Sequence, residues 1–278
     1  METPMDLRPK LFIDTNICIN VANGTIPQAE WQRVRQHIEA HYSYQISAIT
    51  LKEVLAKISR GKDDYFEENK KSLRVLYDAP QRAFLPYPAV FALRTVLGLK
   101  SVARRSSIPE EELYETVCKA LFQASSKTQL KDGVQYPNRP GKLFSFDIDH
   151  FDRHENKPQI EHLDLLEGMR DGRVRMPDPM KLAAYTMEAC GQASDAECCR
   201  KLANALDAAN VFSRNLGKLS KSNHAHLGKR ESDWGDIMQL YYLCDESMHF
   251  LTCDEKCRNQ TQGSPQQRRI LLYRDLAL

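Results

Sequence analysis

Residues 10–16 read KLFIDTN, a short apolar run that ends in an acid and continues into two polar residues. An apolar run of this length beside turn-forming residues is typical of a buried β-strand. The strand would present Asp14 at its carboxyl end, where a polar turn through Thr15 and Asn16 is expected. Open α/β sheets form their sites outside the carboxyl ends of the strands. The segment therefore predicts a central strand and a first site residue.

Strand and helix patterns alternate after this segment. Residues 28–41 carry large apolar side chains at spacings of three and four, which is a helical pattern. Residues 44–49 resemble a second strand. Thr50 is expected to cap the helix that follows, with Glu53 in the first turn at the capping-box position.

The last part of the chain shows the same alternation. A helix is expected over 233–247, a strand over 248–253 (MHFLTC), a short helix over 254–260 and a final strand over 268–276. Strands that alternate with helices predict an α/β fold with a parallel sheet.

The middle of the chain differs from both ends. Residues 131–158 are rich in Pro, Gly, Asp and His and are expected to form a long ordered loop or a small excursion. Five other stretches have a helical period: 63–78, 89–103, 109–127, 178–193 and 195–220. We therefore expect an α/β core formed by residues 1–60 and 231–278, interrupted by a mostly α-helical insertion at 61–230.

Composition limits the class of protein. The 278 residues are 42% hydrophobic and 27% charged, with a net charge of +2, so any nucleic-acid footprint must come from local clusters of basic residues. The sequence has no run of about 18 apolar residues, so no membrane span is predicted, and the N-terminus lacks an apolar leader. Eight irregularly spaced cysteines favour reduced thiols. These features predict a cytoplasmic protein with no membrane partner.

Four acids are predicted to meet at one edge of the sheet. Asp14 and Asp254 follow strands, Glu53 lies early in the helix after the second strand, and Asp236 opens the helix before the strand that leads to Asp254. Carboxylates packed together repel one another unless a cation lies between them. Oxygen ligands suit Mg²⁺ or Mn²⁺, and two such ions about 4 Å apart can promote phosphodiester hydrolysis.

The same residues resemble the PIN-domain nuclease family. The resemblance lies in FIDTN at 12–16, AITLKEV carrying Glu53, DIMQLYYL from Asp236, and FLTCD ending at Asp254. The separations of 39 residues between Asp14 and Glu53, and of 18 between Asp236 and Asp254, match the pattern of that family. The departure is the stretch of 182 residues between Glu53 and Asp236, which is much longer than in small toxin-like members.

The resemblance implies a Rossmann-like three-layer α/β/α core and a metal-dependent endoribonuclease that cleaves single-stranded or looped RNA. Asp14, Glu53, Asp236 and Asp254 would be the catalytic acids and the ligands of Mg²⁺ or Mn²⁺. Thr252 and Asn16 would support them by orienting a ligand or a water.

Several alternatives stay open. Asp233 is a rival to Asp236 as the third acid, because it lies one turn earlier. A structure-directed DNA nuclease would use the same acids, and a catalytically inactive PIN-like binding scaffold would keep them without cleavage. A haloacid-dehalogenase phosphatase needs a second Asp where Asn16 stands, and no segment has the glycine spacing of a phosphate-binding loop.

A basic stretch within 200–230 is the candidate nucleic-acid-binding surface. Its cations could neutralise phosphates and steer RNA toward the acids; an ordinary solvated helix face is the alternative. RNA is the expected partner and DNA the alternative, with an inhibitory protein or a second copy of the chain as further candidates. The residues that we assign to this surface are Arg214, Lys218, Lys221, Lys229 and Arg230.

Overall fold

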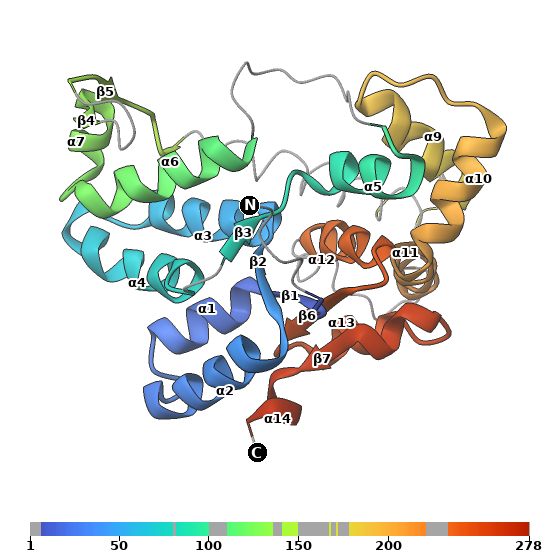
Figure 1. Ribbon diagram of the computed structural model, residues 1–278, viewed down its shortest axis with the longest axis horizontal. Helices are drawn as coiled ribbons and strands as arrows, with labels where there is room; N and C mark the ends of the chain where they lie inside the picture. The colour runs from blue at the N-terminus through green and yellow to red at the C-terminus, as the bar shows by residue number, and fades with distance from the viewer. Residues whose placement is uncertain are drawn as a thin grey trace.

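Five strands form the central sheet of the computed structural model, in the order β3-β2-β1-β6-β7 (Figure 1). Each neighbouring pair in this order is parallel. The structure describes residues 7–79, 82–99, 110–135, 141–149, 167, 171, 178–220 and 233–277. The strands of the sheet are β1 (Lys10–Ile13), β2 (Ser43–Ile46), β3 (Arg82–Phe84), β6 (Met248–Thr252) and β7 (Ile270–Leu272).

Helices make up most of the remaining described chain. Those before residue 140 are α1 (Thr15–Ala22), α2 (Gln28–His41), α3 (Ala48–Arg60), α4 (Phe66–Tyr77), α5 (Pro88–Leu97), α6 (Glu110–Gln123) and α7 (Lys127–Asp132). Those after it are α9 (Pro179–Ala189), α10 (Ala196–Ala205), α11 (Asp207–Ser220), α12 (Asp233–Leu240), α13 (Glu255–Gln260) and α14 (Tyr273–Leu276). Short 3₁₀ turns are η1 (Asp63–Tyr65), η3 (Tyr241–Cys244) and η4 (Pro265–Arg269), and β4 (Val134–Gln135) pairs antiparallel with β5 (Leu143–Phe144).

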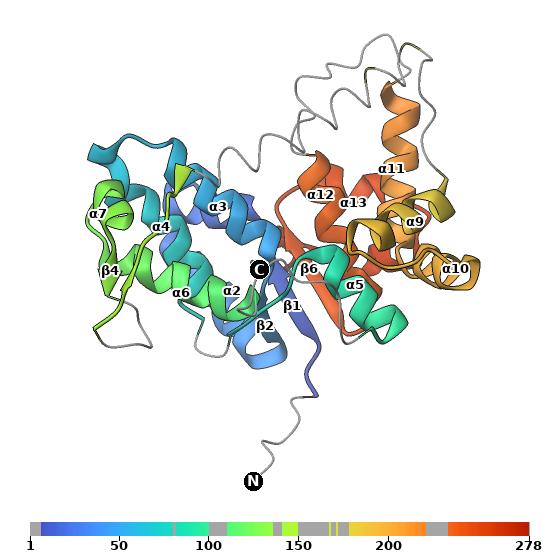
Figure 2. The same ribbon diagram turned by 90° about the horizontal axis from the view of Figure 1, so that it is seen from above.

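The sheet separates two hydrophobic clusters, one on each face. Side chains alternate along β1, so Leu11 and Ile13 pack in one cluster and Phe12 in the other. Helices α1–α4, α6 and α7 supply the first cluster, whereas α5, α9–α12 and α13 supply the second. Figure 2 shows these two groups of helices with the strands between them. A central parallel strand that is covered on both faces must be apolar throughout, which explains the sequence of β1.

The strand order reverses between β1 and β6. From β1 the chain proceeds outward through β2 to β3, and later it returns beside β1 with β6 and continues outward to β7. Ligands of open parallel sheets bind at such a reversal, outside the carboxyl ends of the two strands. In the register of this pair Ile13 lies opposite Leu251, so the residues that follow these two start the loops at the reversal.

Two expectations near the first strand are wrong. The polar turn expected after Asp14 is the start of helix α1, because buried Ile17, Cys18 and Val21 continue the chain at helical spacing. The cap of α3 is Ser47, whose hydroxyl accepts hydrogen bonds from the backbone N–H groups of residues 49 and 50. Thr50 lies inside the first turn, and this shift places Glu53 in the second turn of the helix.

The middle of the chain is not helical throughout. Strand β3 lies within 61–230 and pairs with β2, so the boundary expected at residue 60 does not separate the sheet from the helical segment. The long loop expected from residue 131 contains the β4–β5 hairpin, and its residues from 150 onward lie outside the described ranges.

Two elements expected as continuous are divided. Helix 195–220 breaks into α10 and α11, where the Gln266 side chain donates to Ala205 O and accepts from Ala208 N, each at 2.8 Å. These bonds satisfy backbone groups that the break leaves without helical partners. The final strand spans only Ile270–Leu272, because the chain continues as helix α14.

None of the helices in the described ranges is long and apolar enough to span a bilayer. All eight cysteines lie in described residues, and none of them forms a disulfide.

Candidate active site

Asp14 lies at the reversal point and turns its carboxylate toward β6. Its backbone takes the extended conformation of a helix N-cap, yet its side chain makes no capping hydrogen bond to α1. Instead Asp14 Oδ2 accepts hydrogen bonds from Thr252 Oγ1 and from Asn16 Nδ2, both at 2.6 Å. The backbone N–H of Asp14 donates to Leu251 O at 2.9 Å. The end of β1 is therefore joined to the end of β6 by both backbone and side chain.

Thr252 and Asn16 connect the two loops that follow these strands. Thr252 is fully buried, and its hydroxyl also accepts from the backbone N–H of Asp254 at 2.9 Å. The Asn16 amide oxygen accepts from the backbone N–H of Cys253 at 3.2 Å. Because each side chain bonds to both loops, Asp14 and Asp254 are held next to each other at the carboxyl edge.

Glu53 reaches the same edge from α3. Its Oε2 accepts a hydrogen bond from Thr15 Oγ1, and Thr15 is the residue directly after Asp14. Its Oε1 lies against Gly235 of α12, where an added Cβ would collide with that oxygen. Glu53 thus lies between the start of α1 and the start of α12. A side chain larger than that of glycine at position 235 would require the Glu53 carboxylate to move.

Helix α12 contributes two acids that differ in their surroundings. Asp233 is fully buried, and its Oδ1 forms a 2.6 Å ion pair with Lys256 Nζ. Asp236 is half-buried, one turn along the helix, next to the glycine that contacts Glu53. Within the described chain, no hydrogen-bond donor or cation pairs with Asp236.

Buried hydrogen bonds fix α3 and α12 over the end of β1. The Thr50 hydroxyl donates to Ile13 O at 2.8 Å, and Gln239 Oε1 of α12 accepts from Ser47 Oγ at 3.2 Å. The Tyr242 hydroxyl accepts from Ala48 N at 3.2 Å and donates to the backbone before α5. Buried polar groups that are satisfied in this way rigidify the elements that carry them. The two helices therefore present their acids from fixed positions.

The acids influence one another electrostatically. Burial raises the pKa of Asp14 from 3.8 to about 6; the hydrogen bond from Thr252 opposes this rise, and the charge of Asp254 adds to it. Burial also raises the pKa of Asp236 well above its usual range, and the charges of Asp14 and Glu53 raise it further. Groups that raise each other's pKa lie close together, and without a cation among them they resist full ionisation.

The charges of the acids also raise the pKa values of two thiols next to the cluster. Burial raises the pKa of the Cys257 thiol, and the charges of Asp236 and Asp14 raise it further. Burial raises the pKa of Cys253 to about 11, with Asp14 among the charges that add to the rise. The start of α13 therefore lies against the acids.

As the side chains stand, no three His, Cys, Asp or Glu groups of the described chain are placed to hold one metal ion. Every donor of the four-acid set is a carboxylate oxygen, which is the donor type of hard divalent cations. The set therefore suits Mg²⁺ or Mn²⁺ by its chemistry and its charge.

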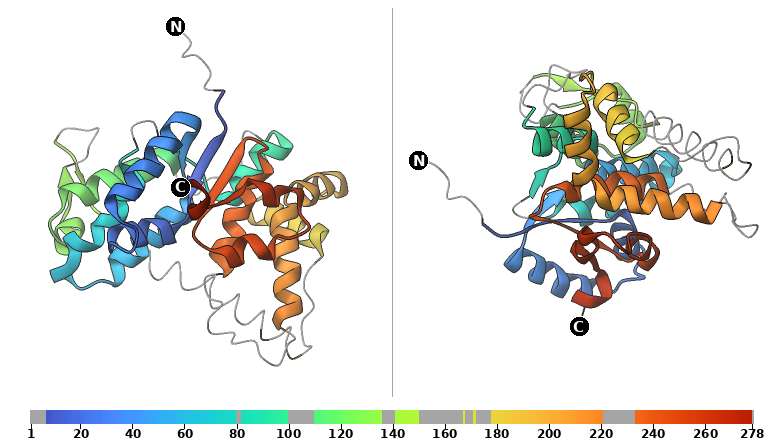
Figure 3. Two further views of the ribbon diagram at one scale, coloured as in Figure 1. Left: turned by 90° about the horizontal axis from the view of Figure 1, so that it is seen from below. Right: turned by 90° about the vertical axis from the view of Figure 1, so that its right-hand side faces the viewer.

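The basic surface is described only in part. Arg214 and Lys218 are exposed and lie four residues apart on α11, so they share one face of that helix. Helix α11 packs against α12 and extends outward past it (Figures 2 and 3). Lys221, Lys229 and Arg230 lie outside the described residues.

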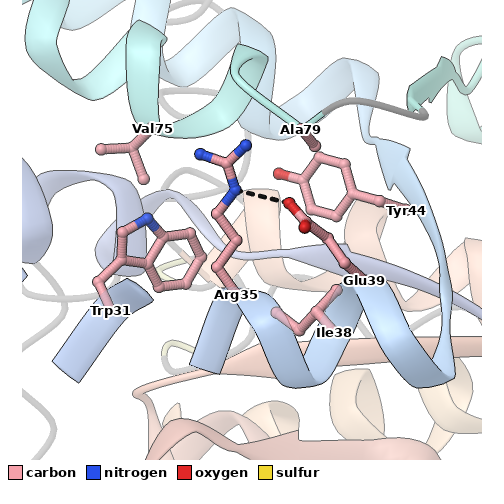
Figure 4. Close-up of a pocket in the computed structure, with 7 residues that line it drawn as sticks. All are labelled: Trp31, Arg35, Ile38, Glu39, Tyr44, Val75 and Ala79. Atoms are coloured by element: carbon pink, nitrogen blue, oxygen red, sulfur yellow. Dashed lines mark hydrogen bonds and ion pairs between the residues drawn. The ribbon is translucent and has the colours of Figure 1, made fainter. Parts of the chain in front are cut away.

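A small pocket lies away from the acids, between α2, β2 and the end of α4 (Figure 4). Its volume of about 10 Å³ suits a single water, whereas ligand pockets measure about 300–1,000 Å³. An Arg35–Glu39 ion pair of 2.8 Å lies at the pocket. We assign it no ligand. The lining residues are Trp31, Arg35, Ile38, Glu39, Tyr44, Val75 and Ala79.

Sequence reasoning missed three residues that shape this site: Gly235, Gln239 and Lys256. Thr15 was identified as part of the FIDTN motif, but not as the hydrogen-bond partner of Glu53. Gly235 carried a usable signal, because a glycine inside a predicted helix costs about 1 kcal/mol and often marks a close approach. Gln239 and Lys256 carried none, since their side-chain partners lie in other elements of the fold.

Comparisons of this chain with protein-family models, curated proteins and solved structures find no match.

Proposed function

We propose that this protein is a divalent-metal-dependent endoribonuclease with a PIN-type core, which hydrolyses phosphodiester bonds of single-stranded or looped RNA. The observation that carries the proposal is the grouping of Asp14, Glu53, Asp236 and Asp254 at the reversal of strand order, with charges that raise the pKa values of Asp14 and Asp236. The resemblance of the four motifs to PIN-domain nucleases agrees with this placement.

The four carboxylates would hold Mg²⁺ or Mn²⁺. When bound, such ions supply an activated water and a Lewis acid for phosphodiester hydrolysis. Thr252 and Asn16 orient Asp14 through the 2.6 Å hydrogen bonds that they donate to Oδ2, and Thr15 orients Glu53. These three residues therefore hold two of the four carboxylates in place before a metal binds.

Asp236 is the third ligand in this proposal, rather than Asp233. The Asp233 carboxylate is fully buried and already paired with Lys256, so a metal would have to displace that cation. Asp236 is more exposed and has no such partner in the described chain.

We also propose an RNA-binding surface on α11. Arg214 and Lys218 on α11 would bind the RNA backbone, together with Lys221, Lys229 and Arg230. A PIN-type core would include the five-stranded sheet and therefore β3 from the middle of the chain. We place the protein in the cytoplasm, where eight thiols without disulfides stay reduced.

A cleavage assay with purified protein tests the function. Fluorescently labelled single-stranded RNA and DNA of equal sequence are incubated with and without Mn²⁺, and Asp14→Asn serves as the control for contaminating nuclease. We expect Mn²⁺-dependent cleavage within the RNA by the wild type alone. Preferential cleavage of DNA would support a DNA nuclease, and no divalent-dependent cleavage of either polymer would refute the proposal in favour of a binding scaffold.

A further inference from the structure

Lys256 lies at the rim of the acidic site and contacts it through two groups. Its backbone N–H donates to Asp254 Oδ1 at 2.7 Å, and its ammonium pairs with Asp233 Oδ1 at 2.6 Å. The residue therefore extends from the acid that follows β6 to the acid that opens α12. Its cation lies against Asp233, three residues before Asp236 on α12.

The two members of this ion pair differ in exposure. The Asp233 side chain is fully buried, whereas the Lys256 side chain is 40% exposed. A buried carboxylate retains its charge only with a partner, so Asp233 fixes the position of the ammonium. An ammonium has three donors, and the pair with Asp233 leaves others to face the exposed side. Lys256 can thus bind a second anion without leaving the first.

A phosphodiester that approaches four carboxylates meets a repulsive field. A cation that is fixed at the edge of that field lowers the repulsion and can donate a charge-assisted hydrogen bond to a non-bridging phosphate oxygen. We propose that Lys256 is the phosphate-binding cation of this site and that Asp233 is a positioning residue, which holds the ammonium in place. This inference rests on the proposed function, because it takes the nucleic-acid backbone as substrate.

The test measures binding of a short fluorescein-labelled single-stranded RNA by anisotropy in EDTA, over a series of KCl concentrations. Each phosphate contact on a single strand contributes about 0.7 to the slope of log K against log salt. Lys256→Met should lower the slope by about 0.7 and weaken binding, whereas Lys256→Arg should keep the slope. Lys71→Met is the matched control, since it removes one charge from an exposed pair with Glu68 within α4 and should leave the slope unchanged.

The positioning role of Asp233 has its own readout. Asp233→Asn keeps the cation but loses its fixed placement, so the salt slope should stay near the wild-type value while kcat in Mn²⁺ falls about tenfold. If the pair only ties α12 to α13, Lys256→Met and Asp233→Asn should lower the melting temperature and leave the salt slope unchanged. The double variant Lys256→Met/Asp233→Asn leaves no unpaired buried carboxylate, so it reports the slope if the single variant fails to fold.

The outcomes separate this inference from the proposed nuclease. A wild-type slope in Lys256→Met or in the double variant would overturn the role of Lys256, and so would a wild type that does not bind RNA in EDTA. A slope that depends on Lys256, in a wild type without Mn²⁺-dependent cleavage, would retain the phosphate contact and refute the nuclease.

Discussion

Replacing Asp14 with Asn should stabilise the metal-free protein at alkaline pH and abolish cleavage. Burial raises the pKa of Asp14 from 3.8 to about 6, so over this range the folded state retains a proton that the unfolded state releases. The contribution of Asp14 to the stability of the wild type in EDTA should therefore be most favourable below about pH 4 and should be lost as the pH rises through about 6. The loss corresponds to about 3 kcal/mol, at 1.36 kcal/mol for each pKa unit.

The substitution removes this loss. The new amide oxygen can still accept from Thr252 and Asn16, and the pKa of about 6 already includes the effect of the hydrogen bond from Thr252. We therefore expect Asp14→Asn to gain about 3 kcal/mol at about pH 8 and nothing below about pH 4.

Urea unfolding in EDTA at several pH values measures the free energy directly, and addition of Mn²⁺ should stabilise the wild type more than the variant. Asp245→Asn is a matched control, for which we expect the opposite change in the free energy of unfolding. Burial works against ionisation of Asp245, but hydrogen bonds from Lys10 and Ser247 lower its pKa overall, so this variant should lose stability at about pH 8. The reasoning fails if the stability difference between Asp14→Asn and the wild type does not grow between about pH 4 and pH 8, or if Asp14→Asn cleaves RNA at the wild-type rate.

Three further predictions concern the same site. Gly235→Ala should lower kcat at least about tenfold with little loss of fold, because the new methyl group displaces the Glu53 carboxylate; unchanged kcat would show that the position of Glu53 is unimportant. Asp236→Asn should lose at least about tenfold more activity than Asp233→Asn, which is about 1.4 kcal/mol of extra barrier, and the opposite order would make Asp233 the ligand. Lys218→Glu should raise KM and flatten the salt dependence of RNA binding while kcat at saturation stays near wild type; no change in either quantity would indicate a solvated helix face.

Local patterns were sufficient for the central strands and their terminal acids. The apolar runs at β1 and β6 are buried on both faces, so they are visible in sequence, and an acid directly after such a run must lie at the carboxyl edge. The order of the four acids along the chain predicted which elements carry them. Asp14 and Asp254 lie within two residues of the end of a strand, and Glu53 and Asp236 lie in the first two turns of a helix.

Elements stabilised by distant contacts were not visible in the same way. Strand β3 has three residues of partial exposure and is held by pairing with β2, so its local pattern is too short to detect. The break between α10 and α11 depends on hydrogen bonds from Gln266, about sixty residues further along the chain.

The contacts that shape the site belong to this second kind. Glu53 meets Gly235 across 182 residues, and Thr252 meets Asp14 across 238. Asp233 and Asp236 lie three residues apart on one helix, yet the first is fully buried and paired with Lys256, whereas the second is half-buried. Patterns along the chain reflect which face of an element is buried, whereas the choice of partner depends on burial, register and helix packing, which form only when distant segments meet.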